Sequence, residues 1–277
     1  MDDIPEALLA EIVKRLTSPC DLKSLSLVSK RLYAIEGELR DAIYIGCGVS
    51  PVTAALVSLC SRFPNLCKVE FNYSGWTHNH GMQLNNHGLQ NCNNLTSISL
   101  RLTPQFNDGS VFRTSLTDDS LKALALRCRM LQSFELIFWG CDRVWPEIGF
   151  TQEGLVMLIQ SCPIRDLVLS GAHIFDDEGM KAISSAQFLE ALELMDCVEV
   201  TNAGMHLLSR CPCLINLTLR QCDGFTDAGV TEVARARNLE SLVIEGCSRV
   251  SLNAVQGAAK SVHYKKDYPG LFDLGRA

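Results

Sequence analysis

Cysteine and histidine are the side chains of this sequence that could bind a metal ion or form disulfides. The chain has thirteen cysteines and six histidines. It contains no Cys-x-x-Cys pair, and the histidines do not lie beside cysteines at zinc-ligand intervals. His78 and His80 could in principle bind a metal ion together, but a polar loop explains them better. We therefore expect no metal and no cofactor.

Nucleophilic and phosphate-binding patterns give no sign of catalysis. Serine, histidine and aspartate occur throughout the chain, but none are grouped in a nucleophile elbow. No glycine-rich phosphate loop follows any expected strand, so nucleotide binding has no support. The sequence predicts a protein that is not an enzyme.

Most of the cysteines have a regular spacing that favours a structural role. Nine of the thirteen fall at two recurring positions, one near the end of an expected helix and one after an expected strand. A small, weakly polar side chain suits a tight interior, and in a reducing compartment such thiols stay free. The first set is Cys60, Cys92, Cys128, Cys162 and Cys211, and the second is Cys141, Cys197, Cys222 and Cys247.

A repeat of 25 residues sets the spacing of these cysteines. Successive units begin at Phe150, Phe175, Val200, Phe225 and Val250. In most of them a Thr or Asp before Gly and an apolar residue predicts a capped helix start. Apolar residues then follow at positions one, four and six, which is typical of a short strand with one buried side. The clearest sets are Leu189, Leu192 and Leu194, then Leu214, Leu217 and Leu219, then Leu239, Leu242 and Ile244.

The constant spacing predicts an α/β solenoid over residues 41–277, with one helix and one short parallel strand per repeat. No single unit can bury its own apolar face, so the units must stack. Similar strand patterns near Leu66, Leu95 and Leu131 bring the count to about seven units, with a worn one at the C-terminus. A doubly wound sheet is the alternative, but its connections vary in length.

The repeat resembles the cysteine-containing class of leucine-rich repeat, most closely in the segment LTLRQCDGFTDAGV at 217–230. This resemblance implies a curved solenoid whose strands line the concave side. It also implies that the concave side binds another protein.

The segment 4–36 has a different pattern. Its first apolar residues follow helical spacing after Pro5, which suits a first helical turn. A break at 17–20 precedes a second helix, which Asp21 can cap. The resulting helical hairpin has more apolar surface than about forty residues can cover alone. A cap on the open end of the solenoid would be one explanation.

The order of these residues resembles an F-box: Pro5, then Leu8-Leu9 and Ile12, and later the run SLVSKR at 26–31. The resemblance implies a helical unit at 1–40 that binds a Skp-type adaptor, which bridges to a cullin ubiquitin ligase. Many F-boxes have tryptophan where this chain has Leu32. The residues that the resemblance assigns to adaptor binding are Ile4, Pro5, Leu8, Leu9, Ile12, Leu16, Leu25, Val28, Ser29 and Leu32.

A target protein would contact the concave strand residues and the loops on one rim. Two stretches break the repeat length, one within 116–150 and one at 103–115, and Trp76 with 78–80 marks a third candidate loop. Aromatic residues on such loops suit a binding hot spot, although they could equally cover the solenoid edge. The residues predicted for target binding are Arg101, Glu135, Ile137, Phe138, Trp139, Trp145, Met195, Arg220 and Glu245.

Composition and charge narrow the choice of partner. The chain is 47% hydrophobic and 20% charged with a formal net charge of −6, so no basic field exists for nucleic acid or an anionic membrane. No apolar stretch approaches the roughly 18 residues of a membrane span, and the N-terminus is acidic. We expect a cytoplasmic or nuclear protein with no nucleic-acid or membrane partner.

The two resemblances together imply the substrate-recognition subunit of an SCF-type ubiquitin ligase, which holds a target protein for ubiquitination and proteasomal degradation. Two alternatives remain: a ligase-independent repeat scaffold or inhibitor, and a hormone-sensing receptor like those of plants. The hormone alternative has less support, because no basic cluster for an inositol phosphate is evident in the chain.

Overall fold

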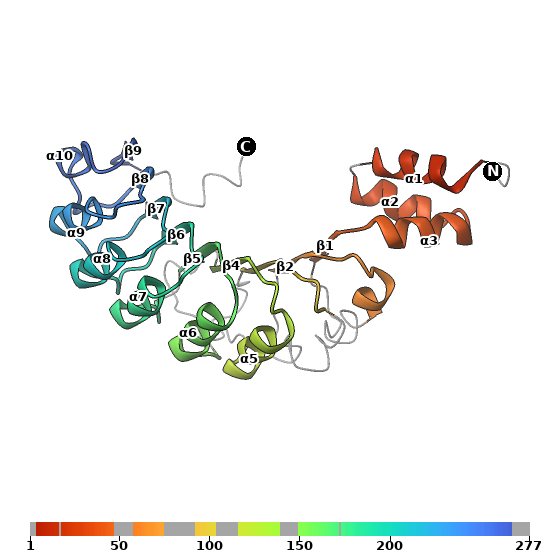
Figure 1. The fold of residues 1–277 in the computed structure, drawn as a ribbon, viewed down its shortest axis with the longest axis horizontal. Coiled ribbons are helices and arrows are strands. Elements are labelled where there is room, and N and C mark those ends of the chain that lie inside the picture. The colour runs from red at the N-terminus through yellow and green to blue at the C-terminus, as the bar shows by residue number, and fades with distance from the viewer. Residues whose placement is uncertain are drawn as a thin grey trace, which may run out of the picture.

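The computed structural model describes residues 4–16, 18–46, 58–74, 92–103, 116–138, 149–171 and 173–267. A unit of helices comes first, and it is followed by repeats whose strands form one curved sheet (Figure 1). The helices of the repeats lie along the convex side of the curve, and the strands line its concave side.

The N-terminal unit contains three helices, α1 (Glu6–Lys14), α2 (Pro19–Ser26) and α3 (Lys30–Leu39). Both α1 and α2 pack against α3. The predicted hairpin is wrong in one respect, because its second helix is broken between α2 and α3. Ser29 has an extended backbone, with φ −156° and ψ 157°, and its side chain accepts a hydrogen bond from Leu32 N, so a new helix starts there.

The start of α2 also differs from the prediction. Ser18 caps this helix by accepting a hydrogen bond from Asp21 N, and Pro19 occupies the first helical position. Asp21 therefore lies in the first turn instead of capping it, where its negative charge still favours the helix start.

Nine parallel strands, each paired with its neighbours in chain order, form the sheet in the described part of the chain. The register aligns the leucines of successive repeats: Leu167, Leu192, Leu217 and Leu242 pair in turn. A doubly wound sheet would permute the strands and cover both faces, so the predicted solenoid is confirmed. The strands are β1 (Ala42–Gly46), β2 (Lys68–Ser74), β3 (Ser97–Thr103), β4 (Ser133–Phe138), β5 (Asp166–Ser170), β6 (Ala191–Met195), β7 (Asn216–Arg220), β8 (Ser241–Glu245) and β9 (Ser261–Lys265).

The sheet extends beyond the seven strands marked by the apolar signature. β1 follows the helical unit directly and pairs with β2, and β9 pairs with β8 at the other end. The helices of the repeats are α5 (Asp118–Arg127), α6 (Gln152–Ser161), α7 (Asp177–Ser184), α8 (Asn202–Leu208), α9 (Asp227–Val233) and the short α10 (Leu252–Val255). Residues 58–62 are also helical.

Side chains at the helix starts connect successive repeats, in what we call the helix-start ladder. The first residue of one helix accepts a hydrogen bond from the backbone N–H of the residue that precedes the next helix. Asp177 Oδ1 accepts from Thr201 N at 2.8 Å, and Asn202 Oδ1 accepts from Thr226 N at 2.9 Å. These N–H groups have no partner within their own helix. The ladder also joins Asp118 to Thr151, Gln152 to Asp176 and Asp227 to Ser251.

Glycine at the third position of α6 to α9 leaves room for the ladder. A Cβ at Gly204 would overlap the carboxylate of Asp177, and a Cβ at Gly229 would lie 2.7 Å from Asn202 Oδ1. In α6 to α9 the glycine therefore avoids an overlap with the neighbouring repeat, whereas α10 has Ala254 at this position beside the bond from Ser251 to Asp227.

The buried cysteines also connect neighbouring repeats. The thiols of Cys197, Cys222 and Cys247 each donate to a strand carbonyl of the preceding repeat, for example Cys222 Sγ to Leu194 O at 3.5 Å. In the second column, Cys162 Sγ donates to Cys128 O, and Cys128 Sγ donates to Cys92 O, each at 3.6 Å. The structural interpretation of these cysteines fits their burial.

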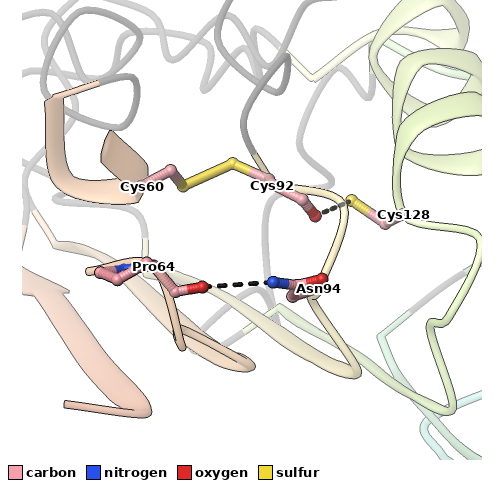
Figure 2. The surroundings of a disulfide bond; sticks show 5 residues. All are labelled: Cys60, Pro64, Cys92, Asn94 and Cys128. Carbon is pink, nitrogen blue, oxygen red and sulfur yellow. Dashed lines mark hydrogen bonds between the residues drawn. A yellow bond between two sulfur atoms is a disulfide. The ribbon is translucent and has the colours of Figure 1, made fainter. Parts of the chain in front are cut away.

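One pair departs from the expectation of free thiols, because Cys60 and Cys92 form a disulfide (Figure 2). Both residues occupy the same repeat position, and stacking brings their Cα atoms to 5.9 Å, within the normal range for a disulfide. Asn94 Nδ2 donates to Pro64 O across the same two repeats at 3.2 Å. Two independent links thus join the first repeats of the solenoid.

Candidate protein-binding surfaces

The N-terminal unit exposes large apolar side chains. Leu8 and Ile12 lie one turn apart on α1, and Leu27 and Val28 occupy the turn between α2 and α3. All four are more than half exposed, and Leu27 reaches 80%. Scattered exposed leucines are normal on proteins, but four on a unit of this size are unusual enough to indicate a contact surface.

Two residues assigned to the adaptor surface lie instead in the core of the unit. Leu9 is 4% exposed and Leu32 is 3% exposed, and both pack with Val13 and Ile35. The reason is geometric, because adjacent residues on a helix point about 100° apart, so Leu8 faces outward when Leu9 faces α3. These two assignments are corrected.

The other residues assigned to adaptor binding differ in how far they are buried. Ile4 and Leu25 are partly buried and pack against the unit's core. Leu16 is half-buried, Pro5 is exposed just before α1, and Ser29 is the cap of α3. The exposed residues that can contact a partner are therefore Pro5, Leu8, Ile12 and Val28, together with Leu27. Leu27 lies in the run SLVSKR that resembles an F-box, but the resemblance did not assign it to adaptor binding.

A buried ion-pair cluster fixes the helical unit to the first repeat. Glu36 on α3 is 1% exposed. It forms ion pairs with Arg40, which directly follows α3, and with Arg62 of the first repeat. Arg62 Nη2 lies 2.9 Å from Glu36 Oε2. The Arg62 guanidinium also lies 4.0 Å from the ring centroid of Tyr33, a cation–π contact. The unit and the solenoid therefore share a defined orientation.

The strand register places most of the predicted target-binding residues in one row on the concave face. Leucines at alternate positions point toward the helices, so the residues between them point the other way. The row runs across β3 to β8 as Arg101, Ile137, Ser170, Met195, Arg220 and Glu245. A second row beside it contains Ser99, Glu135, Val168, Glu193 and Thr218.

Each arginine of the first row lies between two carboxylates. Arg101 lies 3.3 Å from Glu70 and 3.9 Å from Glu135, whose Oε2 also accepts a hydrogen bond from Ser99 at 2.7 Å. We call this the β3 cluster.

The second arginine has the same arrangement four strands away. Arg220 Nε donates to Glu245 Oε2 at 2.7 Å, and its Nη1 donates to Glu193. His263 Nε2 lies 3.2 Å from Glu245 Oε1. We call this the β7 cluster.

Two of the predicted target contacts are largely buried. Phe138 is 3% exposed and its ring stacks against Phe150 with centroids 6.5 Å apart, so it belongs to the core and is not a rim residue. It follows the strand alternation that buries Phe134 and Leu136. Met195 is only 7% exposed. Trp139 and Trp145, the segment 104–115, Trp76 and residues 78–80 lie outside the described residues.

The described residues contain no group of three or more His, Cys, Asp or Glu side chains placed to hold a metal ion. Burial, followed by the nearby Cys162, raises the pKa of Cys128 to about 12, and burial raises that of Cys162 to about 11. Burial lowers the pKa of His173 to about 4. These groups are neutral at physiological pH and lie in packed surroundings.

A family model described as Leucine Rich repeat matches residues 160–184, the stretch from the end of α6 through β5 into α7. The fold is a leucine-rich-repeat solenoid. Repeats of this class are typical of protein binding and typically non-catalytic. Among the described residues, no helix has both the length and the apolar character needed to cross a membrane.

Three solved structures are similar to this chain at low identity. A yeast complex of Rad7 and Elc1 is 14% identical over 92% of this chain and 91% of the other, with a TM-score of 0.32. The leucine-rich repeat domain of the type III effector XopL is 15% identical over 98% and 92%, with a TM-score of 0.34. A TLR13–ssRNA13 complex is 13% identical over 82% of this chain and 39% of the other, with a TM-score of 0.41.

Proposed function

We propose that this protein is the target-recognition subunit of an SCF-type ubiquitin ligase, in which residues 4–39 bind a Skp-type adaptor and the repeats bind a target protein. The observation that carries the proposal is the exposed apolar surface of the three-helix unit, made by Leu8, Ile12, Leu27 and Val28. The resemblance of residues 4–36 to an F-box supports the choice of adaptor.

The role of the protein in this proposal is to hold its target in place. The adaptor end binds the ligase while the repeats hold the target, which raises the local concentration of target lysines near the loaded ubiquitin. The buried Glu36–Arg62 pair supports this role, because it keeps the helical unit in one orientation relative to the sheet. In this proposal the ligase's other subunits carry out the bond chemistry.

Co-expression with a Skp-type adaptor tests the proposal. The wild-type chain should purify as a stoichiometric complex, and Leu8→Asp with Ile12→Asp should weaken it at least about tenfold, the equivalent of roughly 1.4 kcal/mol. Both side chains are exposed, so the unit should still fold, which circular dichroism would check. Leu9→Asp is unsuitable because it would place a charge in the core.

The matched control is Leu126→Asp with Met130→Asp, at two side chains of the repeats that are equally exposed. This variant should bind the adaptor as the wild type does. Unchanged adaptor binding by the Leu8 and Ile12 variant, or no complex with the wild-type chain, would refute the proposal.

A further inference from the structure

We infer that the concave face between the β3 and β7 clusters binds an extended protein segment that presents one apolar side chain flanked by two basic ones. This inference deepens the proposed function by giving the chemistry of the target, and it requires only that the repeats bind a protein.

The centre of this face is apolar. Ile137 and Val168 are half-buried, and Ser170 lies between Ile137 and Met195 in the register. Ser170 is 1% exposed, and its Oγ has no hydrogen-bond partner among the described residues. A buried hydroxyl without a partner carries an energetic cost.

Two carboxylates flank the apolar centre at equal separation. Glu135 on β4 and Glu193 on β6 pair in register with Val168 on either side. Neighbouring strands lie about 4.8 Å apart, so these carboxylates belong to backbones roughly 10 Å apart. Both carboxylates are already held by neighbouring side chains. Ser99 donates a hydrogen bond to Glu135, Arg101 pairs with Glu135, and Arg220 pairs with Glu193. A partner would therefore meet carboxylates that need little further ordering.

Charge decides which partner fits. Across the concave positions of β3 to β8, four carboxylates face two guanidinium groups, which leaves the strip negative. The carboxylates are Glu135, Asp166, Glu193 and Glu245, and the guanidinium groups are those of Arg101 and Arg220. Each arginine is already shared between two carboxylates. An acidic segment would have to displace those pairs, whereas a basic segment adds to them.

The spacing of the segment follows from strand geometry. Alternate residues of an extended chain point the same way, and four residues span about 13 Å. A segment with Lys or Arg two positions on either side of a Leu, Ile or Val would place the apolar side chain over Ile137 and Val168. The basic groups would then reach Glu135 and Glu193.

The test uses labelled synthetic peptides and the full chain, with binding read by fluorescence anisotropy. The probe has Lys-Ser-Leu-Ser-Lys at its centre, and the comparison peptides carry Glu in place of both Lys or Ser in place of Leu. The wild type should bind the probe at least about tenfold more tightly than either comparison peptide, and added salt should weaken the probe's binding. Preference for the Glu peptide, or equal binding of all three, would overturn the inference.

Glu135→Gln with Glu193→Gln should remove most of the preference for the Lys peptide. The matched control is Glu153→Gln with Glu178→Gln, two exposed carboxylates on the convex helices α6 and α7, and it should leave the preference unchanged. Unchanged binding by the Glu135 and Glu193 variant would place the segment elsewhere and also overturn the inference. Adaptor binding measured on the same variant separates the two proposals, because it should be unaffected.

Discussion

At the scale of single residues, burial decides the chemistry of the cysteines. A thiol attacks or binds metal as the thiolate, and a raised pKa removes that form at neutral pH. Cys128 and Cys162 are buried, and burial is the largest cause of their raised pKa values. Cys20, on α2, is exposed. The same residue type therefore has opposite reactivity in the two parts of the chain.

Thiol labelling should reveal this difference. With a maleimide at neutral pH under native conditions, Cys20 should be modified well before Cys128 and Cys162, which should be modified only as the protein unfolds. Peptide mass spectrometry at successive times measures the order. Labelling of Cys128 as fast as that of Cys20 would contradict the packing described above, and labelling in denaturant provides the reference rates.

At the scale of elements, the helix-start ladder offers a reason why α6 to α9 have glycine where a helix would favour alanine. Gly204→Ala should improve helix propensity by about 1 kcal/mol. The added Cβ would overlap Asp177, however, and overpacking of this kind costs about 1–3 kcal/mol. The gain in helix propensity and the cost of the overlap have opposite signs, and we expect the cost of the overlap to be larger.

We predict that Gly204→Ala lowers the free energy of unfolding, measured by urea denaturation. Asp177→Ala alone should also be destabilising, because Thr201 N loses its acceptor. Adding Asp177→Ala to Gly204→Ala should cost less than the sum of the two single changes, because the overlap partner is gone. Additive effects would mean that the glycine does not serve the ladder.

Sequence patterns predicted the helices and strands better than they predicted which side of each helix is buried. The leucine spacing gave the strands from β2 to β8 and their common register, because stacking forces identical positions together. It missed β1 and β9, whose sequences lack the leucines that mark a repeat. It also missed the break at Ser29, because Leu25, Val28 and Leu32 continue the helical spacing across it. Helical spacing shows that apolar residues share one side of a helix. Whether a given residue is buried depends on contacts with other helices, which the spacing does not reveal, so Leu9 and Leu32 were assigned to the surface although they lie in the core.

The candidate sites show the same limit. Strand alternation correctly placed Arg101, Glu135, Arg220 and Glu245 on one face. It could not show that each arginine is shared between two carboxylates, since that depends on side chains from three strands. Phe138 was assigned to a rim loop because the repeat is overlong there, whereas the strand continues through it.

At the scale of the whole molecule, a buried carboxylate on α3 joins the helical unit to the first repeat. Glu36 pairs with Arg40 and Arg62, and Tyr33 and Phe63 contact the Arg62 guanidinium. Removal of one partner from a buried ion pair leaves the others without compensation. The junction should thus be more sensitive to substitution than any surface pair.

Glu36→Gln should lower the free energy of unfolding by about 3–5 kcal/mol, the usual cost of breaking a buried ion pair. Glu11→Gln, which breaks the exposed pair between Glu11 and Lys14, should cost less than about 1 kcal/mol. Urea denaturation followed by circular dichroism measures both. Similar small losses for the two variants would show that the junction contributes little to stability.

The in-register stacking of parallel strands also constrains how this surface could change during evolution. The β3 and β7 clusters are four strands apart, so their separation is a whole number of strand spacings. Loss or gain of one repeat between them would move the clusters by about 4.8 Å at once, while a point substitution would leave their separation unchanged. Duplication and deletion of repeats would therefore alter the length of segment that is recognised in discrete steps, and substitutions on the strands would alter its charge.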